Sequence, residues 1–93
     1  MKQTNELAVE DFEGRIGQSF LINNQPVTLA EVDRMDAPAK SMRTQVSLIF
    51  RSDGELGISD GQEPFFHPEL GEHVLVVNRI ADPEGPAYEI ILA

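Results

Sequence analysis

The 93-residue sequence predicts one mainly β domain spanning residues 1–93, a small antiparallel β-barrel or sandwich of five to six strands with one short N-terminal helix. Three observations predict it: short runs rich in β-branched and aromatic residues, Gly/Pro/Asn/Asp turn signals between them, and a length that allows one modest core. The most strand-like run is Gln45–Arg51, QVSLIFR, which places Val46, Leu48 and Phe50 on one face. We expect it to be the central strand.

The N-terminal part predicts a short helix followed by a strand. Residues 1–6 are polar, and we expect them to be frayed. Leu7–Gly14 has near-helical apolar spacing, and we expect one or two turns whose Phe12 closes an end of the β core. Gln18–Asn23 is the first predicted strand, and the sequence NNQP after it is typical of a turn.

The second predicted strand, Val27–Met35, has an irregular pattern. Val27 and Leu29 share one face, but Val32 falls on the other face under strict alternation. A β-bulge near Ala30–Glu31 would return Val32 to the core. Such bulges bend strands, as closure into a barrel requires.

The rest of the chain predicts four strands and four connections. The strands are Arg43–Ser52, Pro64–Pro68, Glu72–Ile80 and Ala87–Ala93; the connections are Asp36–Met42, Asp53–Glu63, Glu69–Gly71 and Asp82–Pro86. Because proline cannot donate to a ladder, we expect Pro64–Pro68 at an edge or end of the sheet. Val74–Val77 is apolar on both faces, which predicts a strand that is covered on both sides or lies centrally in the sheet.

Charge and composition restrict the possible partners and location. The net charge is −9, and such a field repels phosphate backbones and anionic lipid, so we expect no nucleic acid and no membrane as partner. A basic protein partner or simple solubility explains the acidity better. The expected partner is another protein or a second copy of the chain. Cysteine is absent, no apolar run reaches about 18 residues, and the N-terminus lacks signal-peptide features. We expect a cytoplasmic protein, or one exported only within a larger assembly.

Candidate chemistry is sparse. His67 and His73, with Glu69 and Glu72 between them, suggest a partial metal site, although zinc needs three or four ligands. The acidic connection Asp53–Glu63 could hold calcium but lacks the EF-hand spacing. Nucleophile-elbow and phosphate-loop motifs are absent from the sequence. We therefore expect a non-enzymatic protein without a cofactor, with a small ligand- or metal-binding module as the alternative.

The order of short motifs resembles a known family. The motifs are F-x4-G-x2-F from Phe12 to Phe20, S-L-I-F-R at Ser47–Arg51, H-P-E-L-G at His67–Gly71 and a Tyr-Glu strand at Tyr88–Ile91. Together they resemble a family of short bacterial proteins of unknown function, often encoded beside tail-collar proteins of the microcystin-dependent type. The resemblance covers Leu7–Leu92. It implies a structural or assembly role in association with a phage-tail-like fibre or collar protein. In the family, Phe-Leu-Val-Pro is usual where this chain has Val74–Val77, and Ala-Val-Phe-Asn is the usual C-terminus.

The last predicted strand is the candidate interaction site. Tyr88, Ile90 and Leu92 should face the core, and Ile91 should point outward. We expect Tyr88–Ala93 either to pair with Gln18–Asn23 and close a barrel, or to form an intermolecular sheet. The candidate interaction residues are Tyr88, Glu89, Ile91 and Ala93.

Overall fold

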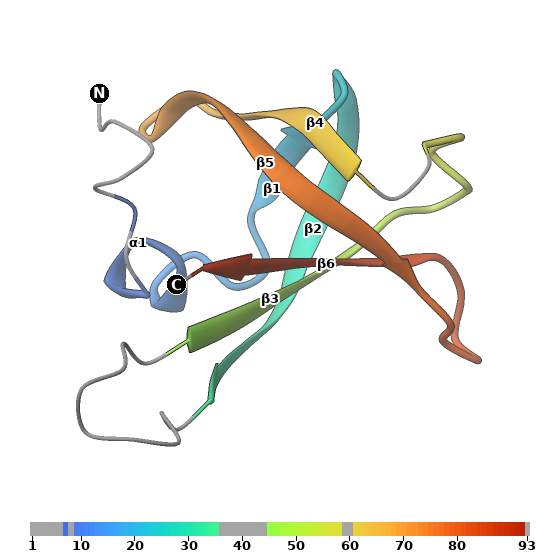
Figure 1. Cartoon of the computed structure of the whole chain (residues 1–93), viewed down its shortest axis with the longest axis horizontal. Helices are drawn as coiled ribbons and strands as arrows, with labels where there is room; N and C mark the ends of the chain where they lie inside the picture. Colours follow the sequence, from blue (N-terminus) through green and yellow to red (C-terminus); the bar gives the residue numbers. More distant parts are fainter. Residues whose placement is uncertain (1–6, 8, 36–44, 59–60, 93) are drawn as a thin grey trace.

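Six antiparallel strands close into a barrel in the order β1-β2-β3-β6-β5-β4 (Figure 1). The structure is a computed structural model that describes residue 7 and residues 9–35, 45–58 and 61–92. The elements are α1 (Glu10–Glu13), β1 (Ser19–Ile22), β2 (Gln25–Met35), β3 (Gln45–Arg51), β4 (Gly61–His67), β5 (Gly71–Ile80) and β6 (Ala87–Leu92). The mainly β prediction with one short helix is confirmed. The predictions of a frayed segment 1–6 and of the loop Asp36–Met42 lie outside the described residues.

The β1–β2 hairpin turns at Asn23 and Asn24, as the NNQP signal predicted. Ile22 pairs with Gln25, so the loop has two residues, and both have positive φ (51° and 62°). Asparagine tolerates this left-handed conformation, which two-residue hairpins with right-handed twist require. Pro26 lies inside β2, opposite Leu21.

The predicted β-bulge is confirmed in β2. Leu29 pairs with Phe50 and Glu31 with Ile49, which leaves Ala30 as the extra residue. The bulge places Val32 opposite Leu48, and Val32 packs against the core. It lies just beyond Thr28, where β2 leaves β1 and continues along β3. The bulge therefore supplies the bend needed to close the barrel.

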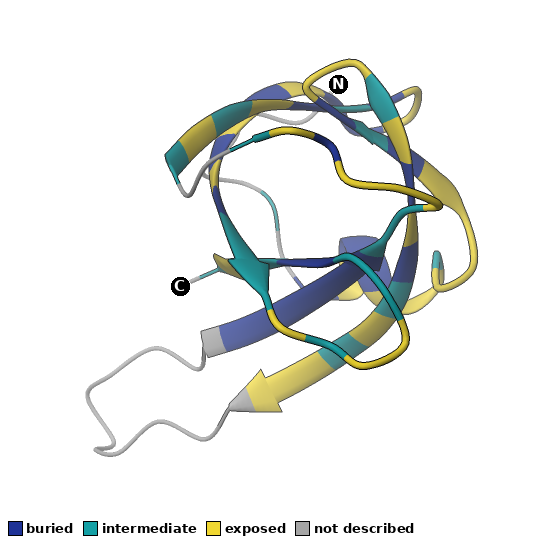
Figure 2. Ribbon diagram, turned by 90° about the vertical axis from the view of Figure 1, so that its right-hand side faces the viewer, coloured by how far each residue is buried: buried dark blue, intermediate teal, exposed yellow. Residues whose placement is uncertain are grey.

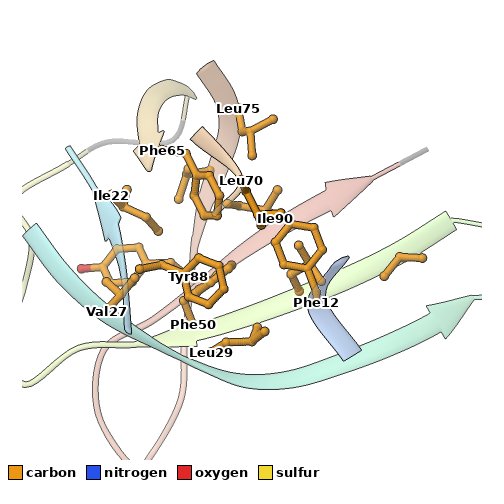
Figure 3. Close-up of a cluster of buried hydrophobic side chains, with 14 of the residues drawn as sticks. Phe12, Ile22, Val27, Leu29, Phe50, Phe65, Leu70, Leu75, Tyr88 and Ile90 are labelled. Atoms are coloured by element: carbon orange, nitrogen blue, oxygen red, sulfur yellow. The ribbon is translucent and has the colours of Figure 1, made fainter. Parts of the chain in front are cut away.

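Aromatic rings fill the barrel from one end. Phe12 of α1 is fully buried, and its ring lies 6.0 Å from that of Phe20 and 6.3 Å from that of Phe65. The labelled side chains in Figure 3 come from α1, the strands and the turn residue Leu70, and they meet inside the barrel. Phe12 thus closes an end of the core, as predicted. The segment after β3 crosses the opposite mouth, facing the viewer in Figure 2, and buries Leu56 there.

β6 is not an edge strand, and its predicted pairing with Gln18–Asn23 is wrong. β6 pairs with β3 from Ala87 to Leu92 and with β5 from Ala87 to Ile90. The barrel closes instead between β1 and β4, through Leu21–Phe66 and Ile22–Phe65. β4 therefore also lies between two strands rather than at an edge. The seam between β1 and β4 is short, with two residue pairs. Next to these pairs, the carbonyl of Pro64 accepts a hydrogen bond from Asn23 N.

β5 lies between β4 and β6, which confirms the central position, but the alternative that both of its faces are covered is wrong for the described residues. Leu75 and Val77 point into the core and are buried. Val74 and Val76 point outward and are 59% and 52% exposed. The reason is the single-layer architecture: a barrel wall has one face inside and one face in solvent, and no described element covers β5 from outside. No helix among the described residues is long and apolar enough to span a membrane.

Candidate functional site

An apolar area lies on the outer wall of the barrel, across β1, β4 and β5. Its members share an outward direction and are at least partly exposed: Leu21, Pro64, Phe66, Val74 and Val76. The strand register makes them neighbours, because Leu21 is opposite Phe66 and Pro64 is opposite Val74. We refer to these five residues as the β4–β5 outer face.

A groove of about 560 Å³ lies along this outer face. Its lining residues are Leu21, Asn24, Pro64, Phe65, Phe66, Glu72, His73 and Val74. The volume is in the range of about 300–1,000 Å³ that is usual for binding sites. Glu72 is exposed and lies opposite Phe66 in the β4–β5 register. The groove therefore offers apolar contact and one carboxylate.

A family model described as "Domain of unknown function (DUF6916)" matches residues 7–92. The chain belongs to this family. No curated protein and no solved structure matches the chain. Family membership thus agrees with a short domain of unknown function and assigns no ligand or partner to the outer face.

The described candidate interaction residues of β6, Tyr88, Glu89 and Ile91, do not form one exposed site. Tyr88 is fully buried, as its predicted core position requires, so its side chain is not accessible to a partner. Glu89 is half-buried and accepts a 2.6 Å hydrogen bond from the hydroxyl of Ser47. Ile91 points outward and is 45% exposed. Ala93 lies outside the described residues.

His67 is held by hydrogen bonds inside the fold. Its Nδ1 accepts a hydrogen bond from Glu69 N at 3.1 Å, so Nε2 carries the proton and donates it to Gln18 Oε1, also at 3.1 Å. The ring is buried and packs on Phe20 with centroids 4.6 Å apart. Burial lowers the pKa of His67, and the positive charge of Arg15 lowers it further, while Glu69 acts in the opposite direction. Both ring nitrogens are therefore engaged, and neither is directed at a ligand.

The second histidine and the acidic connection are also used internally. His73 is buried, and its Nε2 lies 2.7 Å from the carbonyl oxygen of Leu70. Glu55 forms an ion pair with Arg79, which lowers the pKa of the Glu55 carboxyl; the Tyr88 hydroxyl lowers it too. Within residue 7 and residues 9–35, 45–58 and 61–92, no three His, Asp or Glu side chains are grouped to hold a metal ion. Asp60 lies outside those ranges.

The sequence carries a signal for the outer face, although consecutive apolar residues alone predict a covered strand. The run Val74–Val77 is apolar at every position, and in β4 the sequence PFF adds Pro64 and Phe66 to the outward positions. Consecutive apolar residues are expected of a strand with both faces buried. Knowing that these strands belong to a single-walled barrel changes the interpretation, since half of the residues must then face outward.

Proposed function

We propose that this protein is a non-enzymatic assembly or interaction protein that binds another protein through the β4–β5 outer face. The observation that carries the proposal is the pair Val74 and Val76, more than half exposed on a strand whose outward neighbours on β4 include Pro64. Isolated exposed apolar residues are normal on protein surfaces, but contiguous apolar areas mark interaction sites.

The internal use of the histidines supports a role without catalysis. Histidine is the commonest general acid or base, but it needs a nitrogen directed at the substrate. In His67 one nitrogen accepts from Glu69 N and the other faces Gln18, so the ring contributes to turn structure. The family resemblance described above makes a fibre or collar component a specific candidate partner, and self-association is the other form that such an assembly could take.

The proposal is tested by comparing two substitutions of exposed apolar residues. Wild type, Val74→Lys and Ile91→Lys are each co-expressed with the product of a neighbouring gene and analysed by size-exclusion chromatography with light scattering. We expect a complex or oligomer with wild type and with Ile91→Lys, and its loss with Val74→Lys while the circular dichroism spectrum is unchanged.

Two results contradict the proposal. A wild-type chain that remains monomeric and binds no co-expressed neighbour argues against an assembly role. A complex that survives Val74→Lys and is lost with Ile91→Lys would place the contact on β6 instead. Ile91→Lys is a matched control because both residues are outward-facing, aliphatic and close to half exposed or more.

A further inference from the structure

We infer that the groove on the β4–β5 outer face takes a segment of a partner protein that combines apolar side chains with a lysine or arginine, whose charge lies against Glu72. The inference rests on the proposed function and goes beyond it by stating the chemistry of the partner. It has three supports: the apolar walls of the groove, the carboxylate beside them, and the commitment of the chain's own described cations elsewhere.

The apolar walls come from three strands. Leu21 of β1, Phe66 and Pro64 of β4 and Val74 of β5 line the groove. At Pro64–Phe66 the backbone of β4 is paired with β5 on one side, and on the other side with β1 and with Asn23 N. A partner therefore gains affinity here by burying apolar side chains rather than by adding a strand at Pro64–Phe66. A peptide segment with adjacent aliphatic or aromatic side chains meets this requirement.

Glu72 supplies the charge preference. It lines the groove, is exposed, and forms no ion pair with any described residue. A cation that approaches Glu72 beside the buried apolar contacts is partly shielded from water, which strengthens the attraction relative to an open surface. An anionic partner would be repelled both by Glu72 and by the net charge of −9.

A second copy of the chain fits this groove poorly. The four described arginines are all paired with acids of their own chain, Arg15 with Glu69, Arg34 with Glu13, Arg51 with Asp82 and Arg79 with Glu55. A described arginine of a second copy would have to leave or share an acid of its own chain to face Glu72. Two copies with a charge of −9 each would also repel one another. These observations favour a different protein with a basic and apolar segment over a second copy.

The test uses random 12-residue peptides displayed on phage, selected separately on wild type, Glu72→Arg and Val74→Lys. Wild type should enrich peptides with apolar residues next to Lys or Arg, and Glu72→Arg should shift the enriched charge toward Asp or Glu. An enriched peptide, synthesised and measured by fluorescence anisotropy, should bind Glu72→Gln about tenfold more weakly than wild type. The control is Glu31→Gln, which removes one negative charge from an exposed residue of β2 outside the groove. It should bind the peptide as wild type does.

The outcomes separate the two proposals. Enriched apolar peptides that require Val74 but bind Glu72→Gln normally overturn the inference and leave the proposed function intact. A wild-type dimer that Val74→Lys dissociates, with no peptide enriched, makes a second copy the occupant and overturns the inference alone. If no enriched peptide depends on Val74, and the chain is monomeric and forms no complex with its co-expressed neighbour, both the inference and the proposed function fail.

Discussion

The hydroxyl of Tyr88 fixes the segment that crosses one mouth of the barrel, and its removal gives a sharp test of the structure. The ring is fully buried, and the hydroxyl oxygen accepts a 2.9 Å hydrogen bond from the buried amide of Leu56 while donating to Glu55 Oε2 at 3.1 Å. The substitution Tyr88→Phe deletes one oxygen and keeps the ring. It therefore leaves the Leu56 N–H without its acceptor.

The expected cost follows from that single lost acceptor. A buried donor without a partner costs about 1–3 kcal/mol, whereas the bond to the exposed Glu55 adds little. We predict that Tyr88→Phe lowers the free energy of unfolding by about 1–3 kcal/mol, a large share of the roughly 5–15 kcal/mol typical of natural domains. Urea unfolding followed by circular dichroism measures the loss, and hydrogen exchange at the Leu56 amide should become faster than at core amides of β3.

Glu55→Gln is the matched control. It weakens the exposed ion pair with Arg79 and keeps the hydroxyl of Tyr88 as acceptor for Leu56, so it should cost no more than about 1 kcal/mol. The reasoning is refuted if Tyr88→Phe costs less than about 0.5 kcal/mol and leaves exchange at Leu56 unchanged. The segment would then be held by other contacts, such as the 2.8 Å bond from Gln25 Nε2 to the Leu56 carbonyl.

Three further predictions concern the core, pH and metals. Phe12→Ala should cost about 3–5 kcal/mol in urea unfolding because the ring closes the core, and a cost below about 1 kcal/mol would contradict that role. Because the pKa of His67 is lowered in the fold, the unfolded chain binds its proton first as pH falls, so stability should decline from about pH 6.5 down to the lower folded pKa. His67→Gln should flatten that part of the profile, and an unchanged slope would assign it to other groups. Zinc or calcium should not raise the thermal midpoint, whereas stabilisation by about 2.7 kcal/mol at a hundredfold excess over Kd would restore the metal-binding alternative.

Local features of the fold could be predicted because local chemistry determines them. Two adjacent asparagines accept positive φ, so the first hairpin turn follows from residues 23 and 24 themselves. The bulge follows from Val32, an apolar residue on the wrong side of a strict alternation, and it is found between Leu29 and Glu31. Phe12 could be placed at a barrel end because a helix this short is stable only when such a side chain is buried.

The order of strands could not be derived in the same way. Pairing between distant strands depends on their relative arrangement, and the pattern of β6 fits an edge position and an interior position equally well. Tyr88 and Ile90 face the core in either case, so they carry no information about which backbone lies alongside. β6 enters from the Asp82–Pro86 turn, pairs with β5, and then has β3 on its other side. Because β6 lies between β3 and β5, the remaining strands β1 and β4 pair with each other and close the barrel.

The prediction that both faces of β5 are covered failed for a physical reason. Two apolar faces are typical of a strand that is covered on both sides, and the same residue pattern results whether the second cover belongs to the same chain or to another molecule. Within this chain Leu75 and Val77 are covered and Val74 and Val76 are not. Under the proposed function a partner protein would cover the outward face, and the folded chain alone buries only the inward face. Replacing Val74 and Val76 by threonine would then leave the core face untouched and preserve β propensity, so it should keep stability within about 1 kcal/mol while abolishing partner binding. A double variant that binds its partner normally would mean that the second face has no such cover.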